Sequence, residues 1–320
     1  MIKEHIKPAL FGAGTALILG ISFILISNKY GLAKNSFENL NSHESSPILN
    51  PDYALMVDTF SQEMVPQTEL SYPSFSDLLS QVTSKEGTYS IYIKHLDTGD
   101  TYEHNSQALI YGASLYKLLV GGAVYDLISQ DKLSLNYEYT YEHQDFTGGT
   151  GVIQTQSVGT QYSVEQLLNY LFKDSDNIAQ NILVRNIGNN TISSFYDRIS
   201  DPNASSGQFF LSGRTTAKEV AHILINIHQT EAWSRTNKRL YFNHMIGTSF
   251  DDRISVGLSD SLIFAHKIGN WPNGIYHDCG MVFDSSFSNP VAVCLLGEQV
   301  DFDEFLEVSK WVGRFVSSLY

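Results

Sequence analysis

A serine and a lysine stand three residues apart in the stretch YGASLYKLLV, at Ser114 and Lys117. A serine hydroxyl becomes a useful nucleophile only when a neighbouring group takes its proton. A lysine three residues further along a helix lies on the same face, and it can be that base if burial lowers its pKa. The N–H groups at a helix start would favour a developing oxyanion. The pair alone is weak evidence, because Ser129 and Lys132 share its spacing and such pairs are usually a cap and a solvated charge.

Two further segments carry residues that would complete such a site. KDSDNIAQNIL contains Ser-Asp-Asn at 175–177 after a predicted amphipathic helix, and AHKIGN contains Lys-Ile-Gly at 267–269 on a predicted strand. Together the three segments resemble the S-x-x-K, S-D-N and K-T-G motifs of penicillin-recognising serine enzymes. The resemblance covers about residues 70 to 320, and the family is that of class A β-lactamase-like serine hydrolases.

The resemblance implies roles in acylation for four side chains. Ser114 would be the acylated nucleophile and Lys117 its base or proton relay. Ser175 would pass a proton to the leaving nitrogen, and Asn177 would hold Lys117 and the amide side chain of the substrate. Ser175 and Asn177 are also residue types that cap helices, which is the structural alternative for them.

The third motif would bind substrate. Lys267 would supply positive potential for a substrate carboxylate, and Gly269 would let the strand come close. The oxyanion hole would be the backbone N–H groups of Ser114 and Asn270. Lys267 could instead be a solvated lysine on an edge strand. The resemblance implies no metal and no organic cofactor.

The sequence departs from the family pattern in two places. Ile268 stands where the family has a hydroxyl that hydrogen-bonds a substrate carboxylate. In class A β-lactamases a glutamate between the second and third motifs activates the water that releases the acyl group. The matching stretch here, YDRISDPNASSGQFFLSGRTT, contains no glutamate, and Asp197 and Asp201 are its only carboxylates. Slow deacylation is therefore expected.

Two pairs of residues allow other interpretations. His277 and Asp278 are the types found in a Ser-His-Asp triad, but neighbours on a strand point to opposite faces, so we expect structural roles. Cys279 and Cys294 lie at similar distances from the predicted turn at 285–289 and could be cross-strand neighbours. Free buried thiols are the default expectation.

Hydrophobic periodicity predicts the elements that must position these residues. A helix in SFSDLLSQVTSK is followed by a hairpin around the turn at 97–100, and a helical block spans about 113–244. Three strands then lie in LIFAHKIGN, YHDCGMVFD and PVAVCLLGE, before a closing helix. Capping boxes are predicted at Ser163 with Gln166 and at Thr216 with Glu219.

This order of elements predicts an α+β fold. Hairpin-linked strands indicate an antiparallel sheet flanked by helices, in three α/β/α layers, with an inserted all-helical lobe. The resemblance implies the same β-lactamase/transpeptidase-like fold for residues 70–320.

The N-terminal segment indicates where the protein is located, and the net charge of the chain limits its partners. Ala9 to Ile26 is uncharged, which predicts a transmembrane signal-anchor (9–27) followed by a stalk (28–69); a cleaved signal peptide is the alternative. The lysines on the two sides of this run nearly balance, so the orientation is what the resemblance implies: a domain that acts on cell-wall peptides or β-lactams lies outside, with residues 1–8 in the cytoplasm. The formal net charge of -14, without any basic run, argues against nucleic acid as a partner.

The expected function is that of a membrane-anchored, extracytoplasmic serine hydrolase. It would form an acyl-enzyme with a β-lactam or a peptidoglycan-like amide. The alternatives are a non-catalytic module on the same fold that binds cell-wall peptides or a partner protein, and an esterase that uses the same Ser-Lys pair.

Overall fold

The structure is a computed structural model that describes residues 72–320, except for the side chains of Phe210 and Leu211. The predicted cytoplasmic segment, membrane anchor and stalk all lie outside the described residues. Within 72–320, no helix has both the length and the apolar character needed to cross a membrane.

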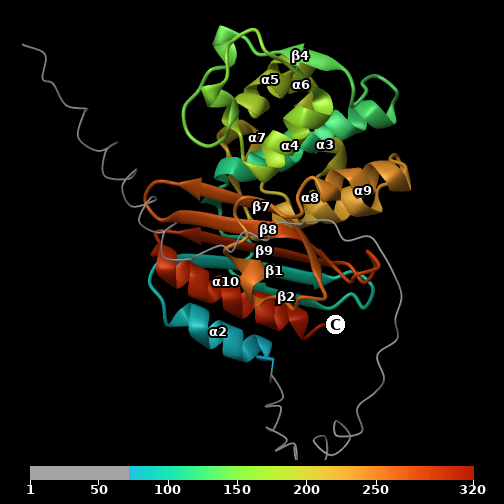
Figure 1. Cartoon of the computed structure of the whole chain (residues 1–320). Coiled ribbons are helices and arrows are strands. Elements are labelled where there is room, and N and C mark those ends of the chain that lie inside the picture. The colour runs from blue at the N-terminus through green and yellow to red at the C-terminus, as the bar shows by residue number, and fades with distance from the viewer. Residues whose placement is uncertain (1–71) are drawn as a thin grey trace, which may run out of the picture. The chain divides into compact units, whose positions relative to one another are not determined.

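A five-stranded antiparallel sheet in the order β2-β1-β9-β8-β7 forms the central layer (Figure 1). β1 pairs with β9 along its length, from Thr88 opposite Glu298 to His95 opposite Val291. Segments from opposite ends of the domain are therefore neighbours, as the prediction of an inserted helical block requires. The strands are β1 (Thr88–His95), β2 (Thr101–His104), β7 (Ile263–Trp271), β8 (Ile275–Phe283) and β9 (Val291–Glu298).

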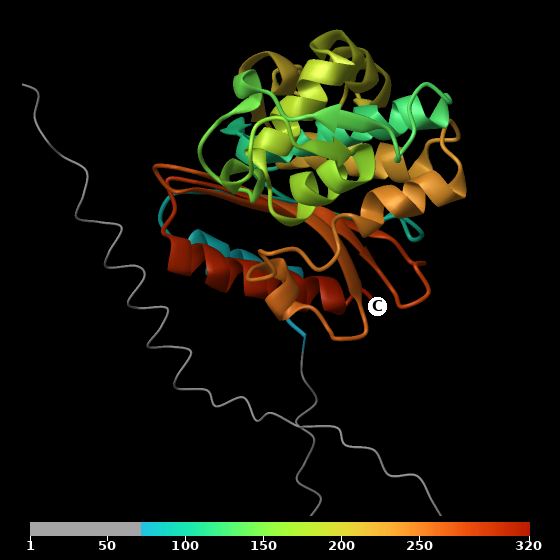
Figure 2. The ribbon, with the colours of Figure 1, turned by 45° about the horizontal axis from the view of Figure 1, so that its top comes forward.

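Helices cover both faces of this sheet. Figures 1 and 2 show α2 and α10 on one side and the helical lobe on the other, which confirms the three-layer α+β prediction. The helices are α2 (Phe75–Thr83), α3 (Tyr116–Ser129), α4 (Val164–Lys173), α5 (Asn177–Ile187), α6 (Asn189–Ile199), α7 (Phe209–Ser212), α8 (Ala217–Gln229), α9 (Arg235–Asn243) and α10 (Phe302–Ser317).

Short elements complete the lobe and its border with the sheet. Two small antiparallel pairs join β3 (Ile110–Tyr111) to β6 (Arg214–Thr215) and β4 (Glu138–Thr140) to β5 (Gln161–Ser163). The 3-10 turns are η2 (Ala113–Leu115), η3 (His143–Asp145), η4 (Ile153–Thr155) and η5 (Ile254–Gly257).

Side chains alternate between two hydrophobic cores across the sheet. Ile91 and Val293 pack with α2 and α10, whereas Tyr92 and Cys294, their neighbours in sequence, pack against the lobe. This alternation is what a strand of period two produces when both faces are covered.

The helix starts agree with the predicted caps at one position and differ at the other. Ser163 and Gln166 exchange both hydrogen bonds of a capping box at the start of α4. At α8, the Thr216 side chain accepts from the Glu219 N–H at 3.0 Å, but the Glu219 carboxylate does not return the bond. It turns instead to side chains of the preceding loop, so the predicted box is wrong in its second half.

The two cysteines form a disulfide, so the expectation of free buried thiols is wrong. Cys279 on β8 lies directly opposite Cys294 on β9, with 4.0 Å between their Cα atoms. The predicted cross-strand neighbourhood is therefore confirmed. Cys279 also pairs with Lys267 of β7, so the disulfide lies beside the third motif on the neighbouring strand.

Candidate active site

Ser114 lies in η2, at the sharp turn that leads into α3. The residue before it, Ala113, has a φ of 46°, a left-handed conformation that costs free energy for any residue with a Cβ. The turn is held because the Gly112 N–H donates to the Gly213 carbonyl at 2.7 Å. Backbone strain is thus concentrated next to the predicted nucleophile.

Lys117 is fully buried in the first turn of α3, and its ammonium faces polar atoms. Nζ lies 3.2 Å from Ser114 Oγ and 3.1 Å from Ser175 Oγ. It donates to the Ser175 carbonyl and to Asn177 Oδ1, each at 2.7 Å. Burial lowers the pKa of Lys117 to about 7, although the charge of Asp176 acts in the opposite direction. A neutral amine is therefore well populated at neutral pH, which a base requires.

The second motif joins the end of α4 to the start of α5. Ser175 has a φ of 51°, and its hydroxyl lies within hydrogen-bond distance of the amino groups of both Lys117 and Lys267. Asp176 caps α5 through Oδ1, which accepts from the N–H groups of Ile178 and Ala179. The capping role therefore belongs to Asp176, which leaves the side chains of Ser175 and Asn177 for the site.

Lys267 extends from β7 toward the same hydroxyl. Its Nζ lies 2.9 Å from Ser175 Oγ and donates to the Ile268 carbonyl at the same distance. Burial, and next the charges of Lys117 and Arg253, hold the pKa of Lys267 well below its ordinary value. The lysine is only 1% exposed, so the alternative of a solvated edge lysine is wrong.

Gly269 and Asn270 bring β7 against the turn that carries the serine. A Cβ at Gly269 would lie 2.8 Å from the His277 ring and 3.1 Å from the Gly112 carbonyl. A side chain at this position would therefore push β7 away from the turn that carries Ser114. The side chain of Asn270 is fixed by Arg253, whose Nη2 donates to Oδ1 at 2.8 Å. The structure therefore brings together all seven predicted site residues.

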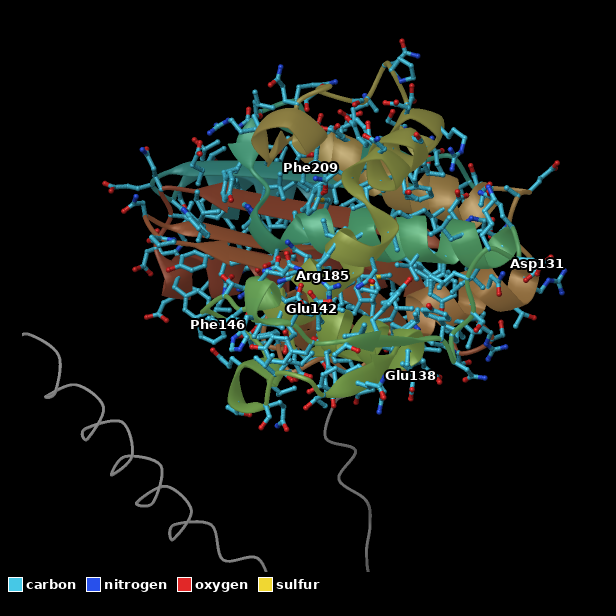
Figure 3. The ribbon with its side chains drawn as sticks, turned by 90° about the horizontal axis from the view of Figure 1, so that it is seen from above. Asp131, Glu138, Glu142, Phe146, Arg185 and Phe209 are labelled. Atoms are coloured by element: carbon cyan, nitrogen blue, oxygen red, sulfur yellow. A yellow bond between two sulfur atoms is a disulfide. The ribbon has the colours of Figure 1, made fainter. Side chains whose placement is uncertain are left out.

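A loop of the helical lobe forms the wall facing β7. The Thr150 hydroxyl donates to the Ser175 carbonyl at 2.7 Å. The base of this loop is held by Arg185, which pairs with Glu142 at 2.9 Å and with Asp145 at 2.8 Å. Figure 3 shows Arg185 beside Glu142, with Phe146 further along the loop at the border of the lobe.

A cavity of about 420 Å³ opens in front of Ser114. Sequence reasoning missed several of its lining residues, which are Tyr111, Tyr116, Thr150, Gln180, Gly213 and Trp271. The sequence could have indicated Trp271, because residues two apart on a strand share a face and Trp271 is therefore on the same face of β7 as Lys267 and Gly269. Tyr111 stands three residues before Ser114, so its closeness to the site was visible in the sequence, whereas Gly213 is brought there only by the fold.

No carboxylate lines this cavity in the described part of the chain. Asp201 lies 3.3 Å from His222 and accepts the Asn203 N–H, and it is not among the lining residues. Glu219, buried below the loop, accepts hydrogen bonds from Ser205 at 2.8 Å and from Ser206 at 2.6 Å. The loop's structure thus depends on a carboxylate that does not reach the cavity.

His277 and Asp278 do point to opposite faces, as predicted. The His277 Nε2–H donates to the Tyr111 carbonyl at 2.8 Å, and burial lowers the pKa of this imidazole to about 4. Asp278 accepts from His266 on the other side of the sheet. Neither residue bonds to Ser114, so the geometry is not that of a Ser-His-Asp triad. Within 72–320 no cluster of His, Cys, Asp and Glu is arranged to hold a metal ion.

Solved structures of the same fold cover nearly all of the described residues. An ancestral class A β-lactamase aligns with a TM-score of 0.68 at 20% identity, covering 77% of this chain and 100% of that one. A PBP-A variant solved as an acyl-enzyme complex with penicillin G aligns with a TM-score of 0.67 at 19% identity, covering 77% and 95%. A β-lactamase from Sphaerobacter thermophilus DSM 20745 gives 0.66 at 19%, covering 76% and 96%. These similarities establish the fold.

Sequence comparison extends the result from fold to family. None of the curated proteins matches the chain. The model of the family described as "Beta-lactamase enzyme family" matches residues 74–320, which is nearly the whole described domain. This match agrees with the three motifs and with the site they form. The chain therefore belongs to the beta-lactamase enzyme family.

Proposed function

We propose that the protein is a serine hydrolase that forms an acyl-enzyme on Ser114 with a β-lactam or a peptidoglycan-like amide. The observation that carries this proposal is the contact between Lys117 Nζ and Ser114 Oγ at 3.2 Å. Because burial brings the pKa of Lys117 to about 7, the amine can take the serine proton at neutral pH.

The contacts support a complete proton route. Neutral Lys117 takes the proton of Ser114 as Oγ bonds to the carbonyl carbon. The resulting ammonium passes a proton to Ser175 Oγ, 3.1 Å away, and Ser175 gives its own proton to the nitrogen as the C–N bond breaks. Lys267, 2.9 Å from Ser175 Oγ, orients this hydroxyl, and a substrate carboxylate bound beside it would favour its charged form against the effect of burial.

The oxyanion would be stabilised by the backbone N–H groups of Ser114 and Asn270. β7 is one of the two edge strands of the sheet, and the absence of a side chain at Gly269 allows this strand to approach the η2 turn. Two fixed N–H dipoles aimed at one oxygen are the usual means of stabilising a tetrahedral intermediate.

Slow release of the acyl group is part of the proposal. Hydrolysis of the ester needs a group that activates water, and among the residues that the structure describes the cavity wall offers hydroxyls and amides but no carboxylate. Ile268 also offers no hydroxyl to a substrate carboxylate, so Lys267 would be its principal partner. The PBP-A variant was solved as an acyl-enzyme with penicillin G, which supports a β-lactam as the probe.

An extracytoplasmic position on an N-terminal membrane anchor is proposed with this activity. It is supported by the uncharged run from Ala9 to Ile26, and by the Cys279–Cys294 disulfide, since such bonds persist in oxidising compartments. A cysteine introduced into the stalk would be treated, in intact cells, with a thiol reagent that does not cross the membrane. Labelling of this cysteine would show that the domain lies outside the membrane, and its protection would show that the domain lies inside.

A labelling experiment tests the acylation. The domain is incubated with a fluorescent penicillin, and the labelled peptide is identified by mass spectrometry. The expected adduct is on Ser114, and it is absent from the Ser114→Ala and Lys117→Ala variants, whose folding is checked by circular dichroism. A folded wild-type protein without adduct would favour the non-catalytic binding module. Ester turnover without penicillin labelling, lost in Lys117→Ala, would favour the esterase.

A further inference from the structure

We propose that Trp271 and Tyr111 form an aromatic subsite that selects substrates whose acyl group carries an aromatic side chain. The inference rests on the proposed acylation of Ser114 and adds the substrate class. Trp271 is a large aromatic side chain that is 55% exposed and lines the same cavity as Ser114.

The position of Trp271 along β7 assigns the subsite to the acyl side. Lys267 and Trp271 are four residues apart and therefore face the same side of the strand, separated by about 13 Å at the usual rise. Lys267 contacts Ser175, the residue proposed to protonate the leaving nitrogen. The leaving group thus lies at the Lys267 end, and the retained acyl group extends toward Trp271.

The second ring is fixed in place by the fold. Tyr111 and Trp271 have ring centroids 5.3 Å apart with planes inclined by 60°. The Tyr111 ring lies against Gly213, where an added Cβ would be 2.9 Å from its Cε2 atom, and Gly213 has a φ of 70°. The two aromatic rings therefore form a wall that exists before substrate binds, which lowers the entropic cost of binding.

The surroundings of this wall favour an uncharged aromatic group. Tyr116, which also lines the cavity, packs against Phe209 with ring centroids 6.3 Å apart, and burial raises its pKa to about 12, so its phenol is neutral. No Asp, Glu, Arg or Lys lines the cavity among the described residues. A phenyl ring stacked on Trp271 would gain from burial and from ring contacts, whereas a charged group at this end would have no opposite charge beside it, since Lys267 lies about 13 Å away along β7.

The test compares two penicillins that differ only in the acyl group. Benzylpenicillin carries phenylacetyl, and its partner carries acetyl on the same nucleus. Second-order acylation rates at Ser114 are measured by intact-mass spectrometry for wild type, Trp271→Ala, Trp271→Phe and the control Tyr137→Ala. Tyr137 is also 55% exposed but does not line the cavity.

Wild type is expected to react about tenfold faster with benzylpenicillin than with the acetyl compound, as expected for filling an apolar pocket. Trp271→Ala should slow only benzylpenicillin, bringing the ratio near one, whereas Trp271→Phe and Tyr137→Ala should largely keep it. Equal rates for wild type, or equal slowing of both compounds in Trp271→Ala, would overturn the subsite and leave the acylation standing. No adduct with either compound would overturn the proposed function and the subsite together.

Discussion

At the scale of single residues, the site is governed by how two lysines are buried. Lys117 and Lys267 both approach the hydroxyl of Ser175, and burial lowers the pKa of each. A buried ammonium is costly unless it is hydrogen-bonded, and here the carbonyl oxygens of Ser175 and Ile268 serve that purpose. The same environment that makes the charge costly makes the neutral amine available as a base.

The protonation of Lys117 predicts a pH dependence of acylation. The protonated ammonium cannot accept the serine proton, so the acylation rate should rise with pH and level off above about 7, the pKa to which burial lowers this lysine. Stopped-flow measurement with a chromogenic β-lactam between pH 5.5 and 9 would follow it. A flat profile over this range, at constant stability, would mean that Lys117 is not the base.

Much of this residue-level arrangement was predictable because the three motifs carry their chemistry in residue type and spacing. The contact between Trp271 and Tyr111 was not, because a tryptophan at the end of a strand becomes part of a binding wall only when a tyrosine 160 residues earlier in the chain is folded against it. The role of Arg253 could not be predicted from the sequence either. Its contacts with Asn270 and with the His277 carbonyl form only when three separate segments come together in the fold.

At the scale of elements, the loop between α6 and α8 positions one side of the cavity. Phe209, labelled in Figure 3, begins the short helix α7 within this loop and packs on Tyr116, two residues after the proposed nucleophile Ser114. The loop in turn is tied to α8, because Glu219 accepts from Ser205, Ser206 and Thr215. The sequence pattern correctly predicted Glu219 in the first turn of a helix. It could not show whether the carboxylate accepts from the backbone N–H of Thr216 or from these hydroxyls.

Replacing Glu219 should therefore loosen the loop. Glu219→Ala leaves several hydroxyls without their acceptor, and we expect it to lower the free energy of unfolding by about 3 kcal/mol, given the cost of buried unpaired polar groups. Urea denaturation would measure this, with Glu231→Ala at an exposed position on the same lobe as the control. A loss within about 0.5 kcal/mol, the range of neutral surface changes, would contradict the role assigned to Glu219.

At the scale of the whole molecule, the sheet separates the proposed catalytic face from a buried charged cluster on the other side. His266, next to Lys267 in sequence, is fully buried between Asp278 at 2.6 Å and Asp251 at 2.7 Å. Burial alone would lower the pKa of His266, but the charge of Asp278 and the hydrogen bonds of both carboxylates raise it to about 9. The imidazole is thus doubly protonated at neutral pH.

This cluster predicts how global stability changes with pH. The pKa of His266 is raised by its two carboxylates from 6.5 to about 9 on folding, so its contribution to stability is complete below about 6.5 and is lost as the pH rises through about 9. The buried lysines act in the opposite direction over this range, so the test is a difference between variants: between pH 7 and 10 the free energy of unfolding of His266→Gln should rise relative to that of the exposed control His143→Gln, because only the control loses the His266 contribution. Parallel curves for the two variants would contradict it.

The fold class and the order of the main elements were also predictable, because several helices carry an apolar face at helical spacing and the sheet strands are short, largely apolar runs bounded by turn residues. The disulfide was not, because register alone decides whether Cys279 meets Cys294, and register depends on the turn between β8 and β9. A shift of one residue would send the two side chains to opposite faces.

The most direct test of the central proposal is the time course of nitrocefin hydrolysis at high protein concentration. Acylation of Ser114 without an activating carboxylate predicts a burst of about one product molecule per protein, followed by a much slower steady phase. The Ser114→Ala variant should show neither. Steady turnover without a burst, or turnover that survives in Ser114→Ala, would contradict the account.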